Sequence, residues 1–217
     1  MKSPLGGSQV GVAAPCRIGA CEGIVLIRHG ETEWSVTGQH TGCTDLTLTQ
    51  SGERGAAGLR CRLRSIRFSR VFTSPLARAQ RTCVLAGLGT EMRTNADLRE
   101  WDYGDYEGLT SEEIYLQKPH WNVFMDGCPS GESVRQIATR ADRLLAQLRS
   151  IPGTVALFSH GHFLRSLAMR WIGLPVGEGR HFALDASSLS ILGYEHPSSA
   201  IPVISTWNNV GSEPVPR

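Results

Sequence analysis

The hydrophobic residues form short continuous runs that alternate with longer amphipathic segments. Residues 23–27 (Gly-Ile-Val-Leu-Ile) and 154–158 (Thr-Val-Ala-Leu-Phe) are runs of the kind found in strands that are buried on both faces. Residues 71–73 predict a third, shorter strand, and the segment 49–63 before it has helical composition. This order of strand, helix and strand indicates an α/β fold.

Two further helices are predicted from their start signals. Pro75 stands at a favourable first helical position directly after Ser74, which could cap a helix following the third strand. The segment 130–133 (Ser-Gly-Glu-Ser) can cap a helix that runs to about Leu148. A Pro-Gly turn then leads the chain into the last of the buried runs.

The alternation of strands and helices predicts a single α/β domain with a mostly parallel central sheet flanked by helices. We expect the folded domain over residues 23–206, a flexible leader over 1–22 and a loose tail over 207–217, because the end segments show no apolar periodicity. Ligands of such sheets bind beyond the carboxyl ends of the strands. His29 and His160 each follow a predicted strand, so neighbouring strands would bring these two side chains together.

Composition and charge restrict the classes of partner. The 217 residues are 41% hydrophobic and 19% charged, with a formal net charge of +2 that gives no general attraction to nucleic acid or anionic membranes. No apolar run approaches the roughly 20 residues that cross a bilayer, and no signal-peptide pattern is present. We therefore expect a cytoplasmic protein without nucleic-acid or membrane partners. Binding of a small anionic ligand is compatible with this charge, because it needs only a local positive pocket.

Two other sets of residues are expected to have no catalytic role. The six cysteines lack CxxC spacing, which predicts reduced thiols rather than a zinc or redox motif. A cluster of arginines is expected to form the solvated face of a helix, with nucleic-acid binding as the less favoured alternative. It consists of Arg60, Arg62, Arg64, Arg67 and Arg70.

Four side chains are candidates for chemistry on a phosphate group: Arg28, His29, Arg78 and His160. Phosphoryl transfer concentrates negative charge on the phosphate oxygens, so a catalyst without a metal needs fixed cationic or N–H donors around its nucleophile. An unprotonated imidazole nitrogen can attack phosphorus while guanidinium groups hold the oxygens. Glu100 could protonate the leaving alkoxide and then activate water against the resulting phosphohistidine.

No metal or other cofactor is expected. His160 and His162 form an HxH pair, but the next ligand of the HxHxD string found in metallohydrolases would stand at Leu164. His162 is therefore expected to form a local hydrogen bond.

Four ordered motifs carry a family resemblance. Residues 26–35 (Leu-Ile-Arg-His-Gly-Glu-Thr-Glu-Trp-Ser) resemble the opening Arg-His-Gly signature of the histidine phosphatases, the phosphoglycerate mutase-like superfamily. Residues 41–49, 74–79 and 159–161 resemble the loop, the second arginine motif and the second histidine motif that follow it. Together the matches cover most of residues 24–192.

The resemblance implies a role for each matching position. His29 would be the phosphorylated nucleophile, Arg28, Arg78 and His160 would bind the phosphoryl group, and Glu100 would be the proton donor. The implied substrate-binding residues are Ser35, His40, Thr41, Gly42, Tyr103, Gly161 and Arg165. In one branch of acid phosphatases an aspartate directly after the second histidine is the acid, but Gly161 stands there in this chain. That departure leaves the role to Glu100.

The segment 100–128 indicates a branch of the family. It resembles the branch that contains sedoheptulose bisphosphatase and related acid phosphatases, which makes a sugar bisphosphate the leading substrate class. Between Tyr103 and Gly131, cofactor-dependent mutases supply an arginine pair for a distal anion, whereas this chain offers only Lys118 as a cation. We therefore favour a phosphatase that hydrolyses its substrate over a mutase. A broad acid phosphatase, a phosphoglycerate mutase and a noncatalytic phosphate-binding scaffold stay open as alternatives, as does a phosphotyrosine phosphatase. A homodimer stays open as well.

Overall fold

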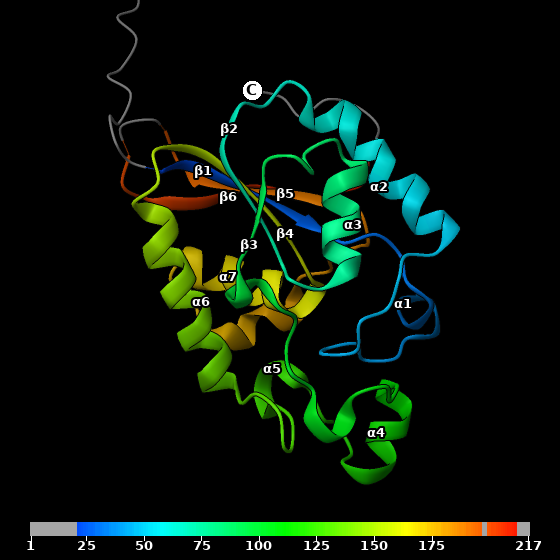
Figure 1. The fold of residues 1–217 in the computed structure, drawn as a ribbon. Coiled ribbons are helices and arrows are strands. Elements are labelled where there is room, and N and C mark those ends of the chain that lie inside the picture. Colours follow the sequence, from blue (N-terminus) through cyan, green and yellow to red (C-terminus); the bar gives the residue numbers. More distant parts are fainter. Residues whose placement is uncertain (1–20, 197–198, 212–217) are drawn as a thin grey trace, which may run out of the picture.

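The computed structural model describes residues 21–196 and 199–211, which form one α/β domain around a six-stranded sheet (Figure 1). The strands lie in the order β3-β2-β4-β1-β5-β6. Their bounds are β1 Cys21–Arg28, β2 Phe68–Thr73, β3 Met92–Thr94, β4 Gly153–Ser159, β5 Leu189–Tyr194 and β6 Pro202–Asn209. The pairs β1–β4, β2–β4 and β2–β3 are parallel, whereas β5 and β6 are antiparallel to their neighbours. The predicted fold class is confirmed.

Helices cover both faces of the sheet (Figure 1). They are α1 Glu33–Thr37, α2 Gln50–Leu63, α3 Ala77–Leu85, α4 Ser111–Gln117, α5 Val123–Asp126, α6 Val134–Arg149 and α7 Gly161–Trp171, with 3₁₀ turns at Ala96–Leu98, Gly104–Tyr106 and Val176–His181. In β1, Val25 and Ile27 pack into the core beneath α2 and α3. Ile24 and Leu26 enter the core beneath α6 and α7. This two-sided burial explains the continuous apolar run at 24–27.

Two predicted helix starts are confirmed in detail. Thr49 caps α2, with its hydroxyl accepting a hydrogen bond from the Gly52 amide. Ser133 caps α6 through a capping box with Gln136. The prediction that Ser74 caps a helix at Pro75 is wrong, because α3 begins at Ala77 and has no side-chain cap. The Ser74 hydroxyl is instead bound to His160, as described below.

Arg62 does not belong to the solvated arginine face. Its side chain is buried and donates to the backbone carbonyl and the side-chain oxygen of Asn209 at 2.6 and 2.9 Å. The contact ties α2 to the end of β6. That strand continues to Asn209, so the first residues of the expected tail belong to the sheet, while the expected leader lies outside the described residues except for Cys21 and Glu22.

Two further expectations concern membrane-spanning helices and the state of the cysteines. Within the described ranges, no helix is long and apolar enough to cross a membrane. The described thiols of Cys43, Cys61, Cys83 and Cys128 are free, and Cys16 lies outside the described residues.

Candidate active site

The carboxyl ends of three parallel strands bring the sequence motifs together. His29 follows β1 and its amide donates to the Ser159 carbonyl at the end of β4, at 2.9 Å. Ser74 follows β2 and its amide donates to the Phe158 carbonyl, also at 2.9 Å. The His29 and His160 rings consequently lie with centroids 5.0 Å apart. The sequence prediction that neighbouring strands place these two histidines together is confirmed.

The ring of His29 is set for nucleophilic attack through one nitrogen. Nδ1 lies 2.7 Å from the Gly30 carbonyl, which can only accept, so Nδ1 carries the proton and Nε2 keeps its lone pair. Burial, followed by the charges of Arg78 and Arg28, holds the pKa of His29 well below its ordinary value. The imidazole is therefore neutral over a wide pH range.

Arg78 and His160 form a buried hydrogen-bonded pair. Nε of Arg78 donates to Nδ1 of His160 at 3.1 Å, which assigns the proton of that ring to Nε2. Nε2 in turn donates to Oγ of Ser74 at 2.8 Å. Burial and the charge of Arg78 hold the pKa of His160 well below its ordinary value. The second histidine is thus a neutral group with both nitrogens engaged.

The remaining donors of Arg78 hold the loop that follows α1. Its Nη atoms donate to the backbone carbonyls of Thr41, Gly42 and Thr44 at 2.8 to 3.0 Å. Glu107 fixes the same loop from the other side, because its carboxylate accepts from the Gly42 and Thr44 amides at 2.9 to 3.0 Å. Arg78 therefore supplies positive charge beside the two histidines and orders their surroundings.

Arg28 contributes a guanidinium with spare hydrogen-bonding capacity. Its Nη1 donates to the Leu184 carbonyl, whereas its buried Nε has no partner. A side chain at position 161 would place its first carbon 3.4 Å from this Nε, so glycine leaves the approach open. An unpaired buried donor is costly unless a ligand satisfies it. Arg28 is accordingly suited to bind an anion beside His29.

Glu100 is held at the first turn of α7. Oε1 accepts from the amides of Trp101 and Phe163 at 2.9 and 2.8 Å, and Oε2 accepts from the His162 amide at 3.0 Å. Only 8% of the residue is exposed. Because Oε2 has one such partner and Oε1 has two, Oε2 keeps more capacity to exchange a proton with a bound molecule.

These groups surround a cavity of about 260 Å³. Of the sequence-predicted residues, its walls contain Arg28, His29, Ser35, His40, Thr41, Glu100, Tyr103, Gly161 and Arg165. Arg78, Gly42 and His160 do not line it and support the wall through the hydrogen bonds given above. The remaining lining residues are Thr32, Trp34, Gly38, Gln39, Ser111, His162 and Leu184.

Tyr103, His162 and Arg165 add further polar groups to the cavity wall. The hydroxyl of Tyr103 is hydrogen-bonded to Nδ1 of His162 at 2.5 Å, and burial raises the pKa of Tyr103 well above its ordinary value. Burial also holds the pKa of His162 well below its ordinary value. Arg165 lies with its guanidinium 4.4 Å above the ring of Phe124, and burial lowers its pKa to about 10. It is still a cation at neutral pH.

Sequence reasoning assigned several of these residues elsewhere. His162 was expected to form a local hydrogen bond, but its ring is hydrogen-bonded to Tyr103, which is distant in the sequence, and the residue also lines the cavity. Ser74 matched the second arginine motif, which was the available signal for its contact with His160. Trp34 lies within the first motif but was assigned no role, and Ser111 lies outside all four motifs. Within the described ranges, no three His, Cys, Asp or Glu side chains are grouped so that they could hold a metal ion.

Comparison with known proteins agrees with this geometry. Residues 24–210 match the model of the histidine phosphatase superfamily, branch 1. The chain belongs to this superfamily. An acid phosphatase of Mycobacterium tuberculosis is 43% identical over 185 residues, which are 83% of this chain and 91% of that protein. The sedoheptulose 1,7-bisphosphatase of Saccharomyces cerevisiae is 40% identical over 184 residues, with 70% and 68% covered.

The fold of this histidine phosphatase also matches solved structures. The product of a Mycobacterium tuberculosis open reading frame superposes with a TM-score of 0.80 at 39% identity, over 86% of this chain and 97% of that one. The family, the phosphoglycerate mutase-like fold and the assignment as a phosphatase are thereby confirmed.

Proposed function

We propose that the chain is a metal-independent phosphomonoesterase that forms a phosphohistidine at His29, with a sugar bisphosphate as its substrate. One observation carries the proposal: the buried His29 keeps the lone pair of Nε2, and Arg28, whose guanidinium has an unpartnered Nε, lines the same cavity. A nucleophile and a cation with spare hydrogen-bonding capacity are thus present in one cavity.

The proposed reaction has two steps. Nε2 of His29 attacks phosphorus and the bond to the ester oxygen breaks, while Glu100 gives that oxygen its proton. Water then attacks the phosphohistidine, Glu100 takes a proton from the water, and the N–P bond breaks to release inorganic phosphate. The guanidinium groups of Arg28 and Arg78 supply the positive charge that a metal supplies in other phosphatases.

Further polar groups in the cavity wall support a substrate with a second polar end. Arg165 provides a cation there, and Tyr103, His40 and His162 add hydrogen-bonding groups. A cavity of about 260 Å³ suits a small sugar phosphate. The yeast relative, which is named for a sugar bisphosphate, favours this class. The mycobacterial relative named acid phosphatase supports the second candidate, a broad-specificity phosphatase.

Phosphate release in EDTA tests the proposal. The panel contains sedoheptulose 1,7-bisphosphate, fructose 1,6-bisphosphate, 3-phosphoglycerate and phosphotyrosine, with His29→Ala beside the parent enzyme. The exposed His120→Asn variant is the matched control and is expected to behave like the parent. We expect selective release from a sugar bisphosphate, lost in His29→Ala, and an acid-labile phosphoenzyme after rapid quenching.

The outcomes separate the candidates. Similar rates on all substrates would support the broad phosphatase, whereas transfer of phosphate between positions of 3-phosphoglycerate with a bisphosphate primer would support the mutase. Activity that survives His29→Ala would overturn the proposed nucleophile. A folded protein that binds phosphate without releasing it from any substrate would be the noncatalytic scaffold.

A further inference from the structure

The guanidinium of Arg140 in α6 uses every one of its donors within the protein. Nη1 donates to the carbonyls of Asp97 and Arg99 at 2.9 and 2.7 Å. Nη2 donates to the Glu100 carbonyl at 3.1 Å and to Oε2 of Glu132 at 2.6 Å, and Nε donates to Oε1 of Glu132 at 2.8 Å. Five N–H groups therefore meet five acceptors, three of them on the segment that carries Glu100.

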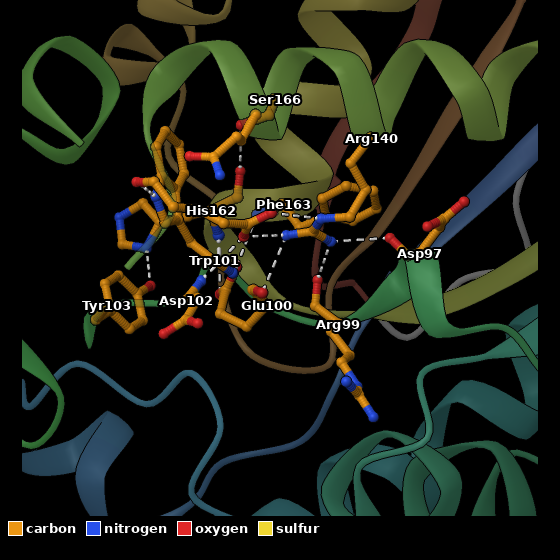
Figure 2. Close-up of polar contacts among 12 residues, drawn as sticks. Asp97, Arg99, Glu100, Trp101, Asp102, Tyr103, Arg140, His162, Phe163 and Ser166 are labelled. Carbon is orange, nitrogen blue, oxygen red and sulfur yellow. Dashed lines mark hydrogen bonds and ion pairs between the residues drawn. The ribbon is translucent and has the colours of Figure 1, made fainter. Parts of the chain in front are cut away.

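Figure 2 shows how Arg140 lies relative to Glu100 and the start of α7. Arg140 reaches the carbonyl side of the segment 97–100, while the carboxylate of Glu100 meets the start of α7. The Arg140 guanidinium also lies 4.3 Å above the ring of Phe163, whose amide binds the Glu100 carboxylate. One side chain thus contacts both the backbone of Glu100 and a residue that orients its carboxylate.

Glu132 also contacts the two residues that follow Glu100. Its Oε2 accepts from the Asp102 amide at 3.0 Å, and its carbonyl accepts from Nε1 of Trp101 at 2.8 Å. Residues 99–103 lie between two 3₁₀ turns and belong to no helix or strand. Because regular secondary structure does not fix this segment, the Arg140–Glu132 pair is its principal restraint on the side facing α6.

We propose that Arg140 is a positioning residue that holds Glu100 in register with the leaving group. The inference rests on the proposed role of Glu100 as proton donor. Lysine keeps the charge of Arg140 but offers three donors in a different geometry, so Arg140→Lys loosens Glu100 without removing it. Displacement of a catalytic group by about 1 Å costs on the order of 100-fold in rate. A smaller displacement of Glu100 is therefore expected to cost roughly 10- to 100-fold.

Leaving-group dependence separates positioning from general stabilisation. An aryl phosphate such as 4-nitrophenyl phosphate releases a stable phenolate and needs little help from an acid, whereas glycerol phosphate releases an alkoxide that needs a proton. The measurement is kcat/KM for both substrates, since this quantity covers transfer to His29. We expect Arg140→Lys to lower kcat/KM by about 10- to 100-fold for glycerol phosphate. For the aryl phosphate, the same variant should lower kcat/KM by less than about 3-fold.

Arg143→Lys is the matched control. Arg143 lies one turn further along α6 and donates to the Asp97 carboxylate at 2.6 Å, so it contacts the same segment without contacting Glu100. We expect it to leave both values of kcat/KM unchanged. Glu100→Gln is expected to show a larger selective loss than Arg140→Lys, and adding Arg140→Lys to Glu100→Gln should cause no further selective loss.

Each outcome decides the inference. Equal losses on both substrates in Glu100→Gln would overturn the proton-donor role and, with it, the inference. A selective loss in Glu100→Gln that Arg140→Lys does not share would overturn the positioning role alone, as would equal losses on both substrates in folded Arg140→Lys. If that variant does not fold, Glu132→Gln decides in its place: a selective loss supports the inference and an unselective one overturns it.

Discussion

Nε of Arg78 donates to Nδ1 of His160 at 3.1 Å, and this contact determines which nitrogen of the second histidine carries its proton. The ring must then donate from Nε2, and Ser74 is the acceptor that the fold provides. A residue of α3 thus determines the tautomer of a histidine at the end of β4, and a residue that follows β2 accepts its proton in a hydrogen bond.

Replacement of Ser74 by alanine is expected to destabilise the protein by about 1–3 kcal/mol, because a buried N–H of His160 loses its partner. Ser166→Ala is the matched control, since that serine is equally buried but its hydroxyl donates to the His162 carbonyl within α7. Its loss should cost less than about 1 kcal/mol. Urea denaturation of both variants measures the difference, and equal losses would contradict the assigned proton position.

A second prediction concerns two glycines of α2. A first side-chain carbon at Gly52 would lie 2.2 Å from the Glu31 carbonyl, whereas one at Gly58 meets nothing within 4 Å. We expect Gly52→Ala to lose about 1–3 kcal/mol and to lower kcat/KM, because residues 30–31 must move beside His29. Gly58→Ala should gain about 0.5–1 kcal/mol. Thermal unfolding and phosphatase assays check both, and a neutral Gly52→Ala would show that α2 can shift freely.

Stability is expected to fall as the pH decreases below about 6.5. The pKa values of His29, His160 and His162 are held well below their ordinary value, chiefly by burial. Between the unfolded and the lower folded pKa, the unfolded chain binds more protons, so acid favours unfolding. Each histidine contributes a slope of about 1.4 kcal/mol per pH unit in that window.

Urea titrations at a series of pH values between 7.5 and 5 measure this slope. His162→Gln should reduce it by the share of one histidine, whereas the exposed His120→Asn should leave it unchanged. A flat profile in the parent protein would contradict the buried neutral state of these rings.

Glu107 is expected to affect activity more than stability. Glu107→Gln removes the charge and one of two acceptors that hold the Gly42 amide, so the loop around Arg78 becomes less well ordered. We expect kcat/KM to fall about 10-fold. Asp105→Asn, which changes an exposed carboxylate bound to Ser130, should retain parent activity. Unchanged kcat/KM in Glu107→Gln would show that Arg78 does not depend on this loop.

The sequence was informative where one pattern has one structural meaning. The apolar runs of β1 and β4 could be interpreted correctly because a short continuous apolar run is typical of a strand with two covered faces and is too short for an ordinary helix. The positions of His29 and His160 after those strands then placed the two rings together. The strands β5 and β6 were not predicted, because their mixed apolar and polar residues also occur in loops.

Contacts within the candidate site were harder to predict from the sequence. Ser74 before Pro75 has the sequence pattern of a helix cap. Its hydrogen bond with His160 depends on the tertiary structure, which the local pattern does not contain. Arg140 offered a weaker signal: it lies three residues after Ile137 and four before Leu144, on the buried row of α6. A charged residue on such a row requires partners. Those partners lie on another segment, so the helix pattern alone could not identify them.

The central position of β1 has a consequence for synthesis. This strand is made first among the six, yet its neighbours β4 and β5 come from the last third of the chain. The apolar residues 24–27 therefore stay without their sheet partners until β4 and β5 have been synthesised. During this period chaperones can bind such exposed apolar segments. Because His29, the proposed nucleophile, directly follows this strand, its surroundings form in a nascent chain only after β4 and β5 have been synthesised.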